Sequence, residues 1–529
     1  MTTAPAENRV VLVNGGIALL LWLVALAVFA LTASSSLGCD EPQTANIVQY
    51  SSSWTDMFRN IVHDANSPLV YMILRAWTTV FGSADQSFKA CVILIASLIP
   101  PSIYLGFQEK LDKRIAIQIA LATALCASFV HHSQLVRSYG LVILLGLLAT
   151  FQLQRMLERA QSKTNLGLYA LLMVAIPYAH LSGLVVWCGH VAVVAFKSWR
   201  GRLDRQARVG FVICIALAAV AVVPLFLPPI STVRQVGIEH VLRRSVWPAV
   251  LLLILPRLVL LAGQHANLPL SLAVSAAVFW ITYMLVIKAR NSMKDRFPRF
   301  DLELWLVMLA GMILAETVVA TQLLRETYVV HFIVPMLLTI VLGFEIVGTR
   351  LPRWLVCVMP FVVLLPLWLP QLAAMHNERR FGAAVVADIL HQQAASGKAA
   401  PYLVITREWY CTGIARYLDA NIPYVCLLSL APSKIIDYMQ VQTMDPQPNI
   451  AKLESLMFDT LAQKRTVFHL YARRKTNESG QADTEGGDFE RKQEKSSAEI
   501  EAWLSAHAKL VGRRELPDCA GPMLLSEYR

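Results

Sequence analysis

Long uninterrupted apolar runs follow one another along the first 370 residues, for example at 10–31 and 88–107. An α-helix needs roughly 17–25 such residues to cross the hydrocarbon core of a bilayer. The two-residue alternation of outer-membrane strands is absent. The pattern therefore predicts a polytopic, all-α membrane module over residues 1–370.

Polar stretches rich in Lys and Arg separate many of these runs. They lie at 107–114, 154–165, 197–208, 288–299 and 348–353. Such loops face the cytoplasm under the positive-inside rule. With a cytoplasmic N-terminus, the first run is a retained transmembrane helix, and the acids that follow it are expected on the outer face.

Two apolar segments, 67–82 and 248–263, fit this arrangement only if they enter the membrane without crossing it. The first is short and contains Arg75, and the second has Pro256 and Arg257 at its centre. We interpret 67–82 as a dipping helix within an outer loop, 33–87. The prediction is eleven full crossings, or thirteen if both segments cross.

The pattern changes after residue 370. Residues 399–428 read as a strand, an amphipathic helix and a second strand, and 466–475 read as another strand. Residues 475–498 are polar and are predicted to be a mobile loop. Residues 371–529 are therefore expected to form a small α/β domain on the outer face, where Cys411 and Cys426 are able to pair.

Composition agrees with a membrane protein: 56% of the residues are hydrophobic and 16% are charged, against about 25% charged in an average soluble domain. The formal net charge is +11. Because the basic residues gather in the loops between apolar runs, this charge indicates membrane orientation and not a nucleic-acid partner.

Acids and arginines meet on the predicted outer face. Asp40 and Glu41 directly follow the first span, and Asp64 precedes the dipping helix. The outer loops also contain arginines that the positive-inside rule disfavours: Arg137, Arg234, Arg243, Arg244 and Arg325. An anionic ligand explains such arginines, because the planar guanidinium suits a phosphate. A carboxylate beside them is able to act as a general base towards a hydroxyl.

The stretches CDEPQTA, NSPLVYMILRAWTTVFG, SQLVRSYGLVILL, AIPYAHLSGLVV and LLRETYVVHFIVPMLL follow one another in the order of a known family. Over residues 10–370 the chain resembles GT-C superfamily glycosyltransferases, in the branch of the protein O-mannosyltransferases and the lipid A aminoarabinose transferases. The resemblance implies transfer of a sugar from a polyprenyl-phosphate donor to a hydroxyl of a lipid, glycan or protein, with inversion, at the outer face of a bacterial inner membrane.

The resemblance also implies roles for individual residues. Asp40 corresponds to the acid that deprotonates the acceptor, and Glu41 is its neighbour. The residues expected to contact the donor phosphate or to line the cavity are Arg137, Tyr139, Arg243, Arg244, Arg325 and Tyr328. At Asn66 and Ser67 the chain departs from the family, where a basic residue or His precedes Pro.

Several alternatives stay open at this stage. Asp64 is either a catalytic residue or the N-cap of the dipping helix. The sequence identifies no cofactor, although a divalent metal ion held by His63 or His240 with Asp40 or Asp64 is an alternative. The rival functions are a polysaccharide polymerase or ligase and a flippase for lipid-linked sugars. A flippase would show charges deep within the spans and inverted repeats.

Overall fold

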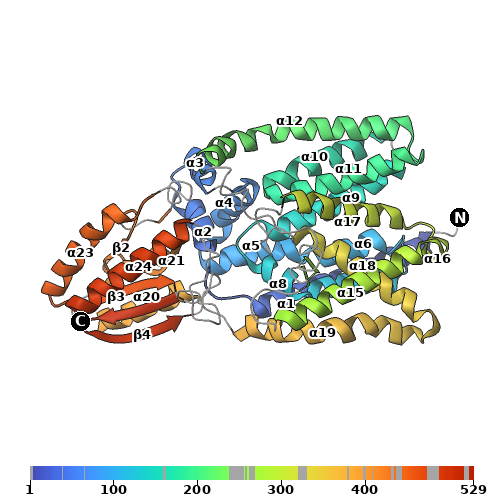
Figure 1. The fold of residues 1–529 in the computed structure, drawn as a ribbon. Coiled ribbons are helices and arrows are strands. Elements are labelled where there is room, and N and C mark those ends of the chain that lie inside the picture. The colour runs from blue at the N-terminus through green and yellow to red at the C-terminus, as the bar shows by residue number, and fades with distance from the viewer. Residues whose placement is uncertain are drawn as a thin grey trace.

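The structure is a computed structural model that describes residues 4–38, 40–64, 66–158, 162–236, 255–256, 259–260, 268–319, 330–377, 381–396, 401–407, 409–430, 434–435, 444–472, 488–516 and 523–529. A long helical module and a smaller sheet domain lie end to end, and the N-terminus is at the end far from the sheet (Figure 1). The predicted fold class, an all-α membrane module followed by a C-terminal α/β domain, is confirmed.

The helical module contains most of the described helices. Before the sheet domain these are α1 (Ala4–Thr32), α2 (Glu41–Tyr50), α3 (Trp54–His63), α4 (Leu69–Phe81), α5 (Asp85–Ser97), α6 (Ile99–Phe107), α7 (Lys113–Leu125), α8 (Ala127–Gln134), α9 (Tyr139–Glu158), α10 (Lys163–Ala179), α11 (Leu184–Trp199), α12 (Arg205–Val236), α15 (Leu268–Lys288), α16 (Arg290–Arg296), α17 (Leu302–Val319), α18 (Ile333–Val347) and α19 (Arg353–Asn377). Short 3₁₀ turns lie at Leu181–Gly183, Val330–Phe332 and Gly348–Arg350.

Within the described residues, seven helices are long and apolar enough to cross a membrane. The number rises to nine if the bent pairs α7–α8 and α15–α16 each form one span. Most of segment 248–263 lies outside the described residues, so the count of eleven to thirteen stays a prediction. Helix α4 has 13 residues and is about 20 Å long, too short to cross a core of about 30 Å.

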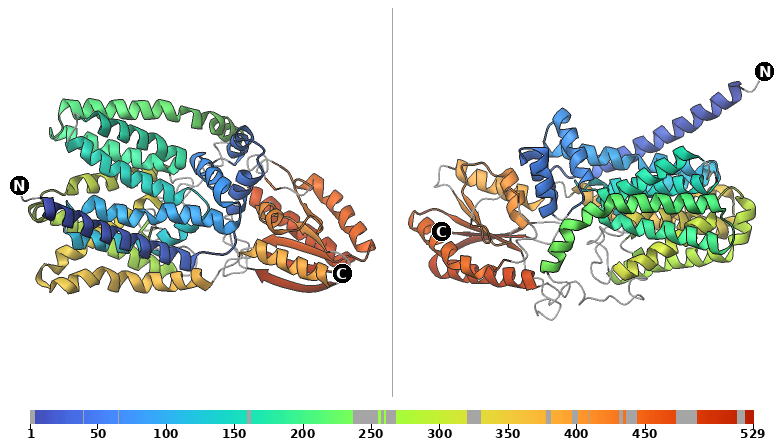
Figure 2. Two further views of the ribbon diagram at one scale, coloured as in Figure 1. Left: turned by 180° about the vertical axis from the view of Figure 1, so that it is seen from behind. Right: turned by 90° about the horizontal axis from the view of Figure 1, so that it is seen from above.

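The short helices α2, α3 and α4 lie between the bundle and the sheet domain in both views of Figure 2. Local sequence sets their ends. Pro42 lies in the first turn of α2, where a missing N–H costs nothing. The Ser53 hydroxyl accepts a hydrogen bond from the Asp56 N–H and so caps α3. These helices form a platform against which the C-terminal domain packs.

The basic loops gather at the opposite end of the bundle. Lys110 pairs with Glu158 at 3.4 Å, Lys197 pairs with Asp301, and Arg202 pairs with Glu303. Helix α16, which carries further basic residues, lies at this end together with the N-terminus (Figure 1). The molecule therefore has one basic end and one end where α2 meets the sheet domain.

The C-terminal domain is a five-stranded sheet with the order β2-β1-β3-β5-β4. Its strands are β1 (Tyr402–Ile405), β2 (Tyr424–Cys426), β3 (Val467–Ala472), β4 (Leu510–Leu516) and β5 (Met523–Tyr528). β1 is parallel to β2 and β3, whereas β5 is antiparallel to β3 and β4. Helices α20 (Gly382–Ala395) and α21 (Trp409–Tyr417) cover one face, and α23 (Gln447–Ala462) and α24 (Asp488–His507) cover the other.

Two details of this region differ from the sequence prediction. Helix α19 continues through residue 370 and ends at Asn377. The prediction of a mobile loop at 475–498 is wrong from residue 488 onwards, because α24 begins at Asp488. This helix forms because Ile500 and Leu504 pack into the core beneath the sheet, although its N-terminal half is almost entirely polar.

Candidate functional site

The acid motif lies at the N-terminus of α2, at the end of the bundle that meets the sheet domain. The Asp40 side chain is 66% exposed, whereas residues 41–48 of α2 are buried. Asp40 occupies the N-cap position of α2, but its carboxylate accepts no capping hydrogen bond from the first turn of the helix. Among the three predicted catalytic acids, Asp40 alone has an exposed carboxylate.

Glu41 is buried and fully engaged. Its Oε1 lies 2.6 Å from Lys89 Nζ on α5 and accepts a hydrogen bond of 2.6 Å from the Val136 N–H. Its Oε2 accepts a hydrogen bond of 2.8 Å from the Gly38 N–H. The side chain therefore joins α2, α5 and the turn after α8, and it fixes the position of its neighbour Asp40.

Asp64 is also buried, and one of its oxygens has three partners. Oδ2 accepts hydrogen bonds from the Tyr71 hydroxyl and from Asn66 Nδ2 at 2.8 Å, and it lies 3.3 Å from Arg137 Nη1. Burial raises the pKa of Asp64, although Arg137 acts in the opposite direction. Burial likewise raises the pKa of Tyr71, so this phenol stays neutral and its hydroxyl donates a hydrogen bond to Asp64.

The N-cap interpretation of Asp64 is wrong. Pro68 occupies the N-cap position of α4, and Asp64 is instead the residue that follows α3 at its C-terminal end. In this position Asp64 contacts Tyr71, which lies on the buried face of α4. Asn66, where the sequence departs from the family pattern, supports Asp64 in this position.

Arg137 joins the two acids. Its Nη2 donates a hydrogen bond of 2.7 Å to the Asp40 backbone oxygen and lies 3.8 Å from Asp40 Oδ2. Its Nη1 faces Asp64 and lies 3.4 Å from the Tyr71 hydroxyl. The side chain is 10% exposed. One nearly buried guanidinium thus lies between one buried and one exposed carboxylate.

Aromatic rings continue the site beyond Arg137. The Tyr139 ring lies 5.5 Å from the His132 ring and 5.5 Å from the His180 ring. His132 is buried, and neither of its ring nitrogens has a hydrogen-bond partner in the part of the chain that the structure describes. Tyr139, which like Arg137 is expected to line the cavity, therefore lies in a cluster with two histidines.

Lys89 and Tyr71 belong to this site but were missed by the sequence analysis. One signal was present for Lys89: it is the second residue of the apolar run at 88–107, at the end where the positive-inside rule disfavours a lysine. Tyr71 had no such signal, because a tyrosine in an apolar helix usually packs or marks a membrane interface.

Other predicted residues are not described. Arg243, Arg244, Arg325, Tyr328 and His240 lie outside the described residues, as do the side chains of His63 and Arg234. In the described ranges, no group of three or more His, Cys, Asp or Glu residues has an arrangement that holds a metal ion. The metal alternative thus gains no support from the residues whose positions are known.

Sequence comparisons give no relative: no protein-family model and no curated protein matches the chain. Comparison of structures does. ArnT from Cupriavidus metallidurans in the apo state aligns with 98% of this chain and 98% of its own, at 14% identity and a TM-score of 0.55. The same protein bound to undecaprenyl phosphate aligns with 98% and 97%, at 12% identity and a TM-score of 0.51.

A second protein with this fold is the archaeal oligosaccharyltransferase AglB from Archaeoglobus fulgidus, in complex with an inhibitory peptide and a dolichol-phosphate. It aligns with 86% of this chain and 69% of its own, at 11% identity and a TM-score of 0.52. ArnT and AglB are both members of the GT-C superfamily. The chain therefore has the GT-C fold, as the sequence resemblance predicts, including the C-terminal domain in the alignment with ArnT.

Proposed function

We propose that the protein is a membrane glycosyltransferase that moves a sugar from a polyprenyl phosphate to a hydroxyl acceptor. The observation that carries this proposal is the contact between exposed Asp40 and nearly buried Arg137, which lie 3.8 Å apart at the N-terminus of α2. This contact combines a solvent-exposed proton acceptor with a cation at the edge of the membrane module.

We propose Asp40 as the general base. Glu41 and Asp64 are buried and already hold several donors, so neither is free to approach an acceptor. Asp40 takes the proton of the acceptor hydroxyl while that oxygen attacks the anomeric carbon. The bond from that carbon to the phosphate oxygen breaks, and polyprenyl phosphate leaves with the electron pair. Attack opposite the leaving group inverts the anomeric centre.

The leaving phosphate needs cations in addition to Arg137, because Asp64 already balances much of the positive charge of the Arg137 guanidinium. Arg243, Arg244 and Arg325 are the arginines that we propose for this task, with Tyr328 as a hydroxyl donor. Charge that develops on a leaving oxygen is stabilised best by donors fixed in place before reaction. Arg137 is fixed in this way, since Asp64, Tyr71 and the Asp40 backbone all hold it.

The site is proposed to face the periplasm of a bacterial inner membrane. Three observations support this side: the basic loops lie at the far end of the bundle, the α/β domain packs beside Asp40, and Cys411 and Cys426 form a disulfide. Disulfides persist in oxidising compartments. The donor chemistry is supported by the GT-C proteins of this fold that bind undecaprenyl phosphate and dolichol-phosphate.

Incubation of the purified protein with radiolabelled polyprenyl-phosphate sugars tests the proposal. We expect release of polyprenyl phosphate that depends on an acceptor, with the label recovered on that acceptor. A flippase would instead carry the intact lipid-linked sugar across a vesicle bilayer without cleaving it. Transport with no cleavage of any donor would therefore contradict a transferase.

A further inference from the structure

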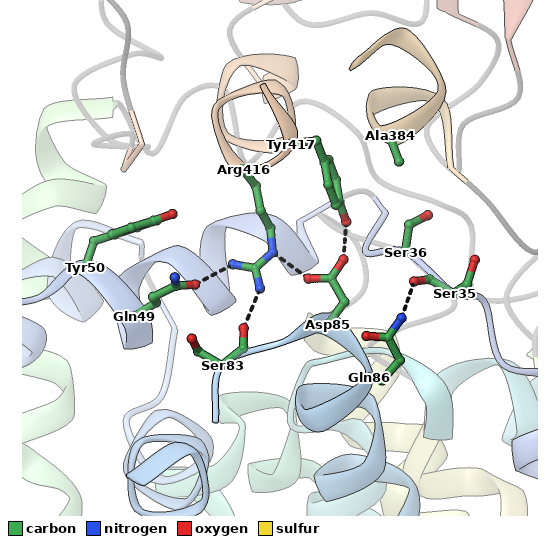
Figure 3. Close-up of a pocket in the computed structure, with 10 residues that line it drawn as sticks. All are labelled: Ser35, Ser36, Gln49, Tyr50, Ser83, Asp85, Gln86, Ala384, Arg416 and Tyr417. Carbon is green, nitrogen blue, oxygen red and sulfur yellow. Dashed lines mark hydrogen bonds and ion pairs between the residues drawn. The ribbon is translucent and has the colours of Figure 1, made fainter. Parts of the chain in front are cut away.

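A polar cleft of about 580 Å³ lies where the acid loop meets the C-terminal domain. The lining residues come from five separate segments of the chain, and Figure 3 shows their side chains around the cleft: Ser35 and Ser36, Gln49 and Tyr50, Ser83 with Asp85 and Gln86, Ala384, and Arg416 and Tyr417. This volume is within the range of small-ligand sites, which often occur between domains. The cleft is distinct from the Asp40–Arg137 contact. Ser35 and Ser36, which line it, belong to the segment that leads to Asp40.

The charged groups of the cleft neutralise each other. Arg416 Nε lies 2.6 Å from Asp85 Oδ1, and the Tyr417 hydroxyl donates to Asp85 Oδ2 at 2.6 Å. The Arg416 Nη atoms donate to Gln49 Oε1 and to the Ser83 backbone oxygen, both at 3.0 Å. The side chains of Arg416 and Asp85 are 6% and 12% exposed. This pair therefore offers a ligand no unpaired charge.

Neutral polar groups and aromatic rings form the rest of the surface. Gln49 and Gln86 are exposed and carry amide groups, and Tyr50 is 37% exposed with Lys434 Nζ 4.2 Å from its ring centre. Amides and serine hydroxyls both donate and accept hydrogen bonds, as sugar hydroxyls do. Aromatic rings offer a flat apolar face with a polar edge. This combination suits a sugar better than an anionic or an apolar ligand.

The cleft is close enough to serve the proposed reaction centre. Ser36 precedes Asp40 by four residues, which limits their separation to about 14 Å. Gln49 and Tyr50 lie at the C-terminal end of the ten-residue helix that Asp40 precedes, about 14 Å away at 1.5 Å per residue. An elongated acceptor with one end in the cleft is thus able to present its other end to Asp40.

We propose that this cleft binds a neutral oligosaccharide, and that the acceptor is therefore a glycan. The inference rests on the proposed transferase function and narrows its acceptor. Lipid A is disfavoured because its phosphates require unpaired cations in the cleft. Asp85 balances the Arg416 charge, and the Lys434 ammonium lies over the Tyr50 ring and outside the lining of the cleft. A protein segment is the other alternative, and the experiment below separates it from a glycan.

Binding of fluorescent tetrasaccharides to the full-length protein tests this assignment. The probes are chitotetraose, maltotetraose and mannotetraose, with lipid A and a Ser/Thr-rich peptide as competitors. Gln86→Trp fills the cleft with a large ring from the exposed start of α5, and Tyr50→Ala removes an aromatic surface. Gln463→Trp, at an exposed position after α23, is the matched control. Unfolding temperatures establish that each variant is folded.

We expect at least one tetrasaccharide to bind, with a loss of tenfold or more in Gln86→Trp and Tyr50→Ala and no change in Gln463→Trp. Binding of undecaprenyl phosphate is expected to be the same in all four proteins, since the cleft does not hold the donor. Three results would overturn the assignment: no tetrasaccharide binds, filling the cleft has no effect, or lipid A or the peptide competes for it. Failure of the donor to bind would instead contradict the transferase proposal.

Discussion

The Glu41 carboxylate and the Lys89 ammonium form a buried ion pair of 2.6 Å between α2 and α5, next to exposed Asp40. The two side chains are 1% and 5% exposed. Burying both charges costs free energy that a surface pair does not, so such a pair is weak evidence for stability alone. Here it fixes the first turn of α2, and with it the backbone on which Asp40 stands.

Removal of one partner tests this role. Lys89→Met leaves the Glu41 charge buried without compensation, and we expect a loss of about 3–5 kcal/mol in the free energy of unfolding. Glu41→Gln combined with Lys89→Met removes both charges and is expected to recover most of that loss. Chemical or thermal unfolding of the two variants gives the comparison. Equal stability of the single and double variants would show that the pair is not coupled.

Asp40→Asn is expected to lower sugar transfer by about 10²–10⁴-fold, the usual contribution of a positioned general base. The unfolding temperature should stay unchanged, because the side chain is exposed and its volume hardly changes. Asp419→Asn is a matched control, since this carboxylate is also exposed, at 74%, but belongs to the α/β domain. The initial rate with a labelled donor is the measurement. Transfer at the wild-type rate would remove Asp40 from the mechanism.

Arg137→Lys keeps a positive charge beside Asp64 but loses the fork that joins Asp64 to Asp40. A donor phosphate then meets a point charge in place of a planar guanidinium, and we expect the apparent KM for the lipid donor to rise about tenfold. Arg114→Lys is the control, because Arg114 pairs with Asp112 at the basic end of the bundle. A donor KM that is equal in both variants would argue against phosphate binding by Arg137.

Most of the fold was predictable because its signals are local. Apolar runs, basic loops and the strands at 402–405 and 467–472 are each visible in a few neighbouring residues. The start of α24 was not predictable in this way. Its buried face carries Gln493, Ser496 and Ser497 in place of large apolar residues, and Ser497 donates a hydrogen bond to Thr406 Oγ1. No hydrophobic periodicity marks such a helix.

The site was predictable only in part, for a different reason. Asp40 and Glu41 are adjacent and chemically alike. The family resemblance singles out Asp40, but nothing in the residues themselves predicts that one carboxylate is buried and the other exposed. Their burial differs because Glu41 meets Lys89, 48 residues away, and the Val136 backbone, 95 residues away. The assignment of Asp64 as a partner of Arg137 likewise depends on a contact across 73 residues.

His469 makes the stability of the C-terminal domain depend on pH. Burial lowers the pKa of this β3 histidine to about 3, from about 6.5 in an unfolded chain. The unfolded state therefore binds the extra proton first, and stability falls as the pH drops from about 6.5 towards 3, by at most about 1.4 kcal/mol per pH unit. His469→Gln removes the titration but keeps a polar partner near Thr406. Unfolding temperatures between pH 4.5 and 7.5 should fall less steeply in this variant, and an equal slope would exclude His469 as the cause.

The disulfide between Cys411 and Cys426 links α21 to β2 and tests the side of the membrane on which the domain lies. The bond closes a loop with a sequence separation of 15 residues, for which chain entropy predicts about 3 kcal/mol of stabilisation. Cys411→Ala, Cys426→Ala and the double variant should therefore lose similar stability, because each lacks the same bond. In cells treated with a membrane-permeant maleimide before lysis, both wild-type thiols should remain unmodified until a reductant is added. Modification of both without reductant would mean that the bond is absent in the cell, and the periplasmic placement would then lose the support that it draws from this pair.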